Sequence, residues 1–116
     1  MSSFPEIPER SSPLRLWYMY RETVCTVIDV DDGSRKVRVT NLQEHPLYRA
    51  FGVNECPSYE DYLEFLESRC FPRTRDKMEL ELQYLGLSAY DPIEIIGKTE
   101  GRMAGDEFWI RMETDT

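Results

Sequence analysis

The alternation of side chains in the first forty residues is the strongest constraint on the fold, because it is typical of β-strands. Residues 14–20 are mostly aromatic and apolar, and Leu16, Tyr18 and Tyr20 occupy alternate positions. Residues 23–30 are rich in β-branched side chains. Asp32-Gly33, which follows, is the strongest hairpin signal in the chain. Residues 36–40 then alternate charged and β-branched side chains. We therefore predict a three-stranded antiparallel meander over residues 14–40.

The second half of the chain has the spacing and capping residues of short helices. Three helices are predicted, over residues 58–69, 75–85 and 92–99. Each has a good N-cap residue at its start or just before it: Ser58, Thr74 and Asp91. Residues 78–83 also alternate strictly, as a strand would, but Met, Glu, Leu and Gln are good helix formers, and we assign helix. A final strand over residues 107–112 is expected to close back onto the meander.

Length and composition place these elements in one α+β domain. A chain of 116 residues is bounded to a single domain, which we assign to residues 14–116. Residues 1–13 contain three prolines and are predicted to be a flexible N-terminal arm. Because no apolar run approaches the ~20 residues of a membrane span and no signal-peptide pattern is present, we expect no membrane association and a cytoplasmic location.

The residue types of common active sites are sparse. His45 is the only histidine, and its surroundings have no nucleophile-elbow pattern. The acidic run that begins at Asp29 has neither the glycine nor the glutamate of a calcium loop at the required positions. Three cysteines lie far apart and form no metal-binding pair: Cys25, Cys56 and Cys70. We therefore expect no catalytic residues, no metal, no cofactor and no enzymatic activity.

Negative charge is concentrated in the second half of the chain. The net charge is −8, and residues 1–50 are balanced, whereas residues 51–116 carry fifteen acidic and seven basic residues. On the first predicted helix, Phe65 flanks the apolar positions that recur at helical spacing: Tyr59, Tyr62, Leu63 and Leu66. Away from that face, three carboxylates follow at i, i+4 and i+7: Glu60, Glu64 and Glu67.

These carboxylates have two interpretations. One is an ordinary solvated face, with Asp61 completing a capping box. The other is a stripe that imitates phosphate spacing and docks in the cationic groove of a nucleic-acid-binding protein. On the second interpretation, the partner-binding set combines these side chains with two from the next helix: Glu60, Asp61, Glu64, Glu67, Glu79 and Glu81. The basic segment from Arg69 to Lys77 is the alternative contact, although ion pairing with neighbouring acids is the simpler use of its charges.

A set of residues in the second half resembles a known pattern. It consists of Arg69, Pro72 and Arg75; residues 85–87 and 90–92; Ile95, Ile96, Thr99 and Gly101; and Asp106 with residues 108–110. This pattern resembles small proteins from mobile elements of gut Firmicutes and the N-terminal region of HipA-type toxin kinases from that group. Its residues are of the types that form helix caps, turns and a final core strand, and none is catalytic. The resemblance therefore implies no kinase activity.

Size, acidity and the absence of an active-site pattern also resemble anti-CRISPR inhibitors. The expected function is therefore a non-enzymatic interaction protein of a mobile genetic element that blocks the nucleic-acid-binding groove of a CRISPR effector nuclease. The alternative is an accessory or antitoxin-like module of a HipA-type toxin–antitoxin system, which would bind a kinase or a DNA-binding partner. In both cases we expect a protein partner and no direct contact with nucleic acid.

Overall fold

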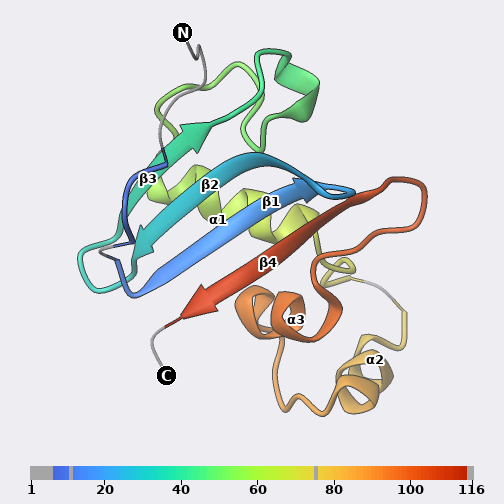
Figure 1. Ribbon diagram of the computed structural model, residues 1–116. Helices are drawn as coiled ribbons and strands as arrows, with labels where there is room; N and C mark the ends of the chain where they lie inside the picture. Colours follow the sequence, from blue (N-terminus) through green and yellow to red (C-terminus); the bar gives the residue numbers. More distant parts are fainter. Residues whose placement is uncertain (1–6, 11, 75, 115–116) are drawn as a thin grey trace, which may run out of the picture.

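The computed structural model describes residues 7–10, 12–74 and 76–114, which form one antiparallel sheet and three α-helices (Figure 1). The elements follow one another as β1 (Leu14–Tyr20), β2 (Thr23–Asp31), β3 (Lys36–Asn41), the 3-10 helix η1 (Pro46–Tyr48), α1 (Tyr59–Ser68), α2 (Met78–Leu85), α3 (Pro92–Thr99) and β4 (Phe108–Thr114). The strand order β3-β2-β1-β4 confirms the α+β class, the meander and the return of the last strand onto β1.

The β2–β3 hairpin lies where Asp32-Gly33 predicts it, but its turn is longer than two residues. Four residues, 32–35, connect the strands, and Arg35 rather than Gly33 adopts the left-handed conformation, with φ of 55°. The Asp31 carboxylate accepts hydrogen bonds from the backbone N–H groups of Gly33 and Ser34, at 3.1 and 3.4 Å. These hydrogen bonds stabilise a longer turn, in which Gly33 does not adopt the left-handed conformation that a two-residue turn would need.

Helix α1 covers one face of the sheet, running behind β1 and β2 in Figure 1. Its buried residues are Tyr62, Phe65 and Leu66, whereas Leu63 is 39% exposed. The predicted core stripe was therefore displaced by part of a turn, with Phe65 inward and Leu63 outward. Phe65 is drawn in because its ring packs edge-on against Tyr18 of β1, at a centroid distance of 5.1 Å.

Helix α2 confirms the helical assignment of residues 78–83, but it begins three residues later than predicted. Its N-cap is Lys77, which has a left-handed backbone and makes no side-chain capping bond, so Thr74 is not the cap. The described residues between Pro72 and Met78 form turns instead of helix, and Arg75, the predicted first residue, lies outside the described residues. Only Leu82 of this helix is buried, and in Figure 1 α2 lies apart from the sheet.

Helix α3 completes the core beside α1. Asp91 caps it as predicted, accepting a hydrogen bond from the Ile93 N–H at 3.1 Å. Ile95 and Ile96 are fully buried. The helix ends in two left-handed residues, and the second is Gly101, where a Cβ atom would lie 3.1 Å from the Ile110 side chain. Glycine at this position lets α3 approach β4 closely.

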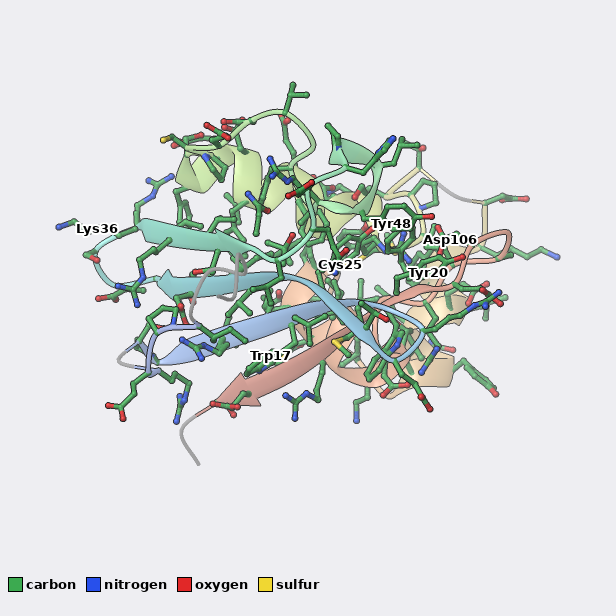
Figure 2. The ribbon with its side chains drawn as sticks, turned by 45° about the horizontal axis from the view of Figure 1, so that its top comes forward. Trp17, Tyr20, Cys25, Lys36, Tyr48 and Asp106 are labelled. Carbon is green, nitrogen blue, oxygen red and sulfur yellow. The ribbon has the colours of Figure 1, made fainter. Side chains whose placement is uncertain are left out.

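The other face of the sheet carries polar and aromatic side chains instead of a helix. Trp17 lies on this face, turned away from α1 (Figure 2). Arg15 and Asp29 are directly opposite one another on β1 and β2, and each is 4% exposed. Arg15 also donates to the Pro8 carbonyl at 2.6 Å. The predicted arm, residues 1–13, lies in part outside the described residues, but its described part contacts this face.

Candidate protein-binding surface

The outer face of α1 presents three carboxylates to solvent. Glu60, Glu64 and Glu67 are all exposed, whereas Tyr62 on the inner face is buried. The arrangement follows from the sequence, because positions i, i+4 and i+7 share one side of a helix. The structure thus brings these three predicted contact residues together on one surface, which we call the α1 acidic face.

Two of the three carboxylates have arginine neighbours. Glu60 lies 3.4 Å from Arg35 of the β2–β3 hairpin, and Glu67 lies 2.5 Å from Arg73. All four side chains are more than 40% exposed, and ion pairs at such sites contribute only about 0–1 kcal/mol. Glu64 has no ion-pair partner in the described part of the chain. It is therefore the carboxylate whose charge is most available to a partner.

Asp61, the fourth predicted residue on α1, has a structural role. Its carboxylate accepts hydrogen bonds from the Ser58 backbone at 2.9 Å and the Asn54 amide at 3.1 Å, and the Ser58 side chain completes the predicted capping box. The bond from the Ser58 backbone is the main reason that the Asp61 pKa lies below its usual value. Asp61 therefore fixes the start of the helix on which the acidic face is built.

The two remaining predicted residues lie on a different surface. Glu79 and Glu81 belong to α2, and in Figure 1 α3 lies between α2 and α1. Glu79 is exposed and Glu81 is half-buried. The predicted set of six is therefore divided: four lie on α1, of which Asp61 caps the helix and three are exposed, and two lie on a separate helix. A single helix-sized groove on a partner would meet only the residues on α1.

Two acidic residues that the sequence did not identify as contact residues lie beside a cavity next to α1. The Tyr59 hydroxyl donates a hydrogen bond to Asp32 of the hairpin at 2.7 Å. Asp32 and Asp91, the N-cap of α3, line one cavity next to α1 together with Tyr59 and Tyr62. Asp32 and Asp91 carry turn and capping signals in the sequence, and nothing local predicts that they line the same cavity.

The basic segment from Arg69 to Lys77 is partly internal. Arg69 is 7% exposed and pairs with both carboxylate oxygens of Asp106, at 3.0 and 3.1 Å. It also donates to the carbonyls of Gly101 and Phe108, each at 2.9 Å. Asp106 lies at the same end of the sheet as Tyr20 of β1 and Tyr48 of η1 (Figure 2). The first base of the segment is thus a structural link between α1 and β4, and Arg75 lies outside the described residues.

The Arg69–Asp106 pair predicts a loss of stability in acid. The hydrogen bond from Arg69 is the main reason that the pKa of Asp106 lies below its usual value of 3.8. Because the folded pKa is lowered, the stabilisation is present above about pH 4 and is lost as the pH falls through the folded pKa. Urea denaturation midpoints measured from about pH 6 to about pH 3 should therefore fall less steeply for Asp106→Asn than for the wild type. An equal fall in both would contradict the assignment.

Groups that could serve as nucleophiles or metal ligands have structural surroundings. His45 accepts a hydrogen bond from the Leu47 N–H at 3.1 Å and so caps η1. Burial raises the pKa of the Cys70 thiol to about 11, and it also raises that of Cys25, so neither is a ready thiolate nucleophile at neutral pH. Among residues 7–10, 12–74 and 76–114, no three His, Cys, Asp or Glu side chains gather as a metal site would need.

Comparisons with known proteins return no match from family models, curated proteins or solved structures. Within the described residues, every helix is too short or too polar to cross a membrane. The geometry of the surfaces and the resemblance described above are therefore the basis for a functional proposal.

Proposed function

We propose that this protein is a non-enzymatic interaction protein that docks its α1 acidic face into the cationic groove of a nucleic-acid-binding protein. The observation that carries the proposal is the row of Glu60, Glu64 and Glu67 on a helix whose other face is anchored in the core. A rigid row of carboxylates can occupy a groove built for phosphates, because the groove supplies cations at similar spacing.

The charge of the whole molecule supports the same partner class. A net charge of −8 disfavours contact with nucleic acid itself and favours a basic protein surface. We propose a CRISPR effector nuclease as the partner, in the manner of anti-CRISPR inhibitors, with binding in the cytoplasm. The protein would then block the groove without cutting or modifying anything.

A second candidate is supported by the Arg69 contacts. Arg69, Gly101, Asp106 and Phe108 belong to the residues that resemble the N-terminal region of HipA-type kinases, and here they join in one hydrogen-bonded network. A shared framework of this kind would suit an accessory or antitoxin-like module that binds a kinase or a DNA-binding partner. Nucleic acid would not displace this protein from such a partner.

The triple variant Glu60→Gln/Glu64→Gln/Glu67→Gln tests the proposal. It should keep the far-UV circular dichroism of the wild type, because all three side chains are exposed, and it should slow association with the partner by about tenfold or more at low salt. Among single changes, Glu64→Gln should have the largest effect, since no arginine of the described residues forms an ion pair with Glu64. Surface plasmon resonance against purified CRISPR effector nucleases measures the association rates.

A matched control separates the α1 acidic face from total charge. Glu9, Glu22 and Glu44 are exposed and lie outside α1. Their triple change to glutamine removes the same three charges and should leave association within about twofold of the wild type, because steering depends on where the charges lie. If both triple variants slow association equally, net charge rather than the α1 acidic face is responsible.

A further inference from the structure

Helix α2 carries apolar side chains on two sides, and only one of them contacts the core. On the inner side Leu82 is buried, and Met78 and Leu85 are half-buried against the core cluster. On the outer side Leu80 is 58% exposed and Tyr84 is 88% exposed. A helix that is apolar on more than one side is typical of a buried position, so the outer side of α2 has the composition of a contact surface.

The helix itself has few local features that stabilise it. It has eight residues and begins after the left-handed Lys77, without a side-chain capping bond. Isolated helices shorter than about 12–15 residues are marginal in water. In Figure 1, α2 lies at the edge of the molecule, apart from the sheet. A second packing contact on its outer side would therefore stabilise it.

The outer side of α2 contains a hollow of about 430 Å³. Four residues line it: Lys77, Leu80, Glu81 and Tyr84. Their spacing is i, i+3, i+4 and i+7, which are neighbouring positions on one side of a helix. Where two helices pack side by side, a side chain of one enters a hole formed by four residues of the other. The hollow on α2 therefore has the form that receives a side chain from another helix.

We propose that α2 is a self-association surface, on which the α2 helix of a second copy packs antiparallel about a two-fold axis near Leu80. Along the outer side the order is Lys77, Leu80, Tyr84, and an antiparallel copy presents these residues in reverse. Each Lys77 ammonium then meets the Tyr84 ring of the other copy in a cation–π contact, and each Leu80 enters the opposite hollow. The surface is thus complementary to itself, as an isologous interface requires.

The size and charge of the protein set the strength of this dimer. A helix of eight residues is about 12 Å long, too short to bury the roughly 800 Å² per partner of a stable interface. We therefore expect a dissociation constant of about 0.1–1 mM. Two copies that each carry a net charge of −8 repel one another, and salt screens this repulsion. Added salt should strengthen the dimer, whereas it should weaken binding through the α1 acidic face.

Sedimentation equilibrium of the full chain tests the proposal. The average mass should rise from that of one chain toward that of two between about 10 µM and about 1 mM protein, and the rise should be larger at about 0.5 M than at about 0.05 M NaCl. The ¹H–¹⁵N NMR signals of residues 77–85 should shift over the same concentration range. A chain that stays monomeric at about 1 mM would overturn the proposal and leave a helix of another protein as the occupant.

A pair of matched variants separates the outer side of α2 from general apolar contact. Leu80→Gln/Tyr84→Gln changes two exposed residues to a good helix former, and it should stay monomeric with the circular dichroism of the wild type. The control Leu47→Gln/Val53→Gln removes side chains that are 76% and 81% exposed outside α2, and it should dimerise as the wild type does. Equal effects of the two double variants would overturn the assignment to α2.

The antiparallel arrangement is tested by Lys77→Asn. Asparagine tolerates a left-handed backbone and is a good N-cap, so the helix should still begin at Met78. The dissociation constant of the dimer should rise about fivefold or more, because two cation–π contacts are lost. An unchanged dissociation constant would overturn the pairing of Lys77 with Tyr84.

Self-association through α2 does not depend on the proposed function. The triple glutamine variant of the α1 acidic face carries less net charge, so it should dimerise at least as strongly as the wild type. If this variant lost dimerisation, the contact would lie on α1 and the proposal for α2 would be overturned.

Discussion

Replacing Arg15 with methionine should lower the free energy of unfolding by about 3 kcal/mol, which is a large share of the stability of a domain this size. Arg15 and Asp29 form a bidentate pair at 2.7 and 3.0 Å, and both are 4% exposed. The change leaves the Asp29 carboxylate buried with only Ser12 at 3.3 Å and the exposed Arg38 at 3.7 Å near it. Differential scanning calorimetry should show a melting temperature lower by about 10 °C.

The double variant Arg15→Met/Asp29→Leu separates the cost of an unpaired charge from the contribution of the pair. Because replacing both members of a buried pair with apolar groups is often close to neutral, its free energy of unfolding should lie within about 1–2 kcal/mol of the wild type. A double variant that is less stable than Arg15→Met would contradict this account of the second sheet face.

Replacing Arg69 with methionine should also lower the free energy of unfolding by about 3 kcal/mol. It removes four hydrogen bonds, two to Asp106 and one to each of two backbone carbonyls, and all four link α1 to the segment around β4. Urea denaturation followed by tryptophan fluorescence measures the loss, since Trp109 lies in β4.

Arg73→Met is the matched control for Arg69. Arg73 is four residues further along the chain and pairs with Glu67, but its side chain is 56% exposed. Its loss should lower the free energy of unfolding by less than about 1 kcal/mol. If the two variants were equally stable, the Arg69 contacts would have no special part in joining α1 to β4.

The sequence predicted those parts of the fold that depend on neighbouring residues. The alternation of β1 to β3, the capping box of α1 and the Asp91-Pro92 start of α3 are local patterns, and the structure confirms each. The predicted start of α2 was wrong, because the helix begins after a left-handed residue, Lys77, and not after a side-chain cap. The inward turn of Phe65 depends on Tyr18, which is distant in the chain.

The candidate site could likewise be predicted only where it depends on neighbouring residues. The α1 acidic face could be predicted because helical spacing alone groups Glu60, Glu64 and Glu67. The separation of Glu79 from them depends on how the helices pack, and so does the position of Asp32 and Asp91 beside one cavity. No local pattern in the sequence predicts that packing. The ion pair between the buried Arg69 and Asp106 could not be predicted for the same reason, since its members are 37 residues apart.

Competition with nucleic acid shows whether the protein occupies the groove of an effector nuclease. The protein is immobilised and offered purified CRISPR effector nucleases, HipA-type kinases and their DNA-binding antitoxins, at low and at high salt. We expect salt-sensitive capture of an effector nuclease, release when guide RNA or target DNA is added, and no capture by the triple glutamine variant of the α1 acidic face. Capture of a kinase or an antitoxin that neither nucleic acid nor this variant affects would contradict this expectation.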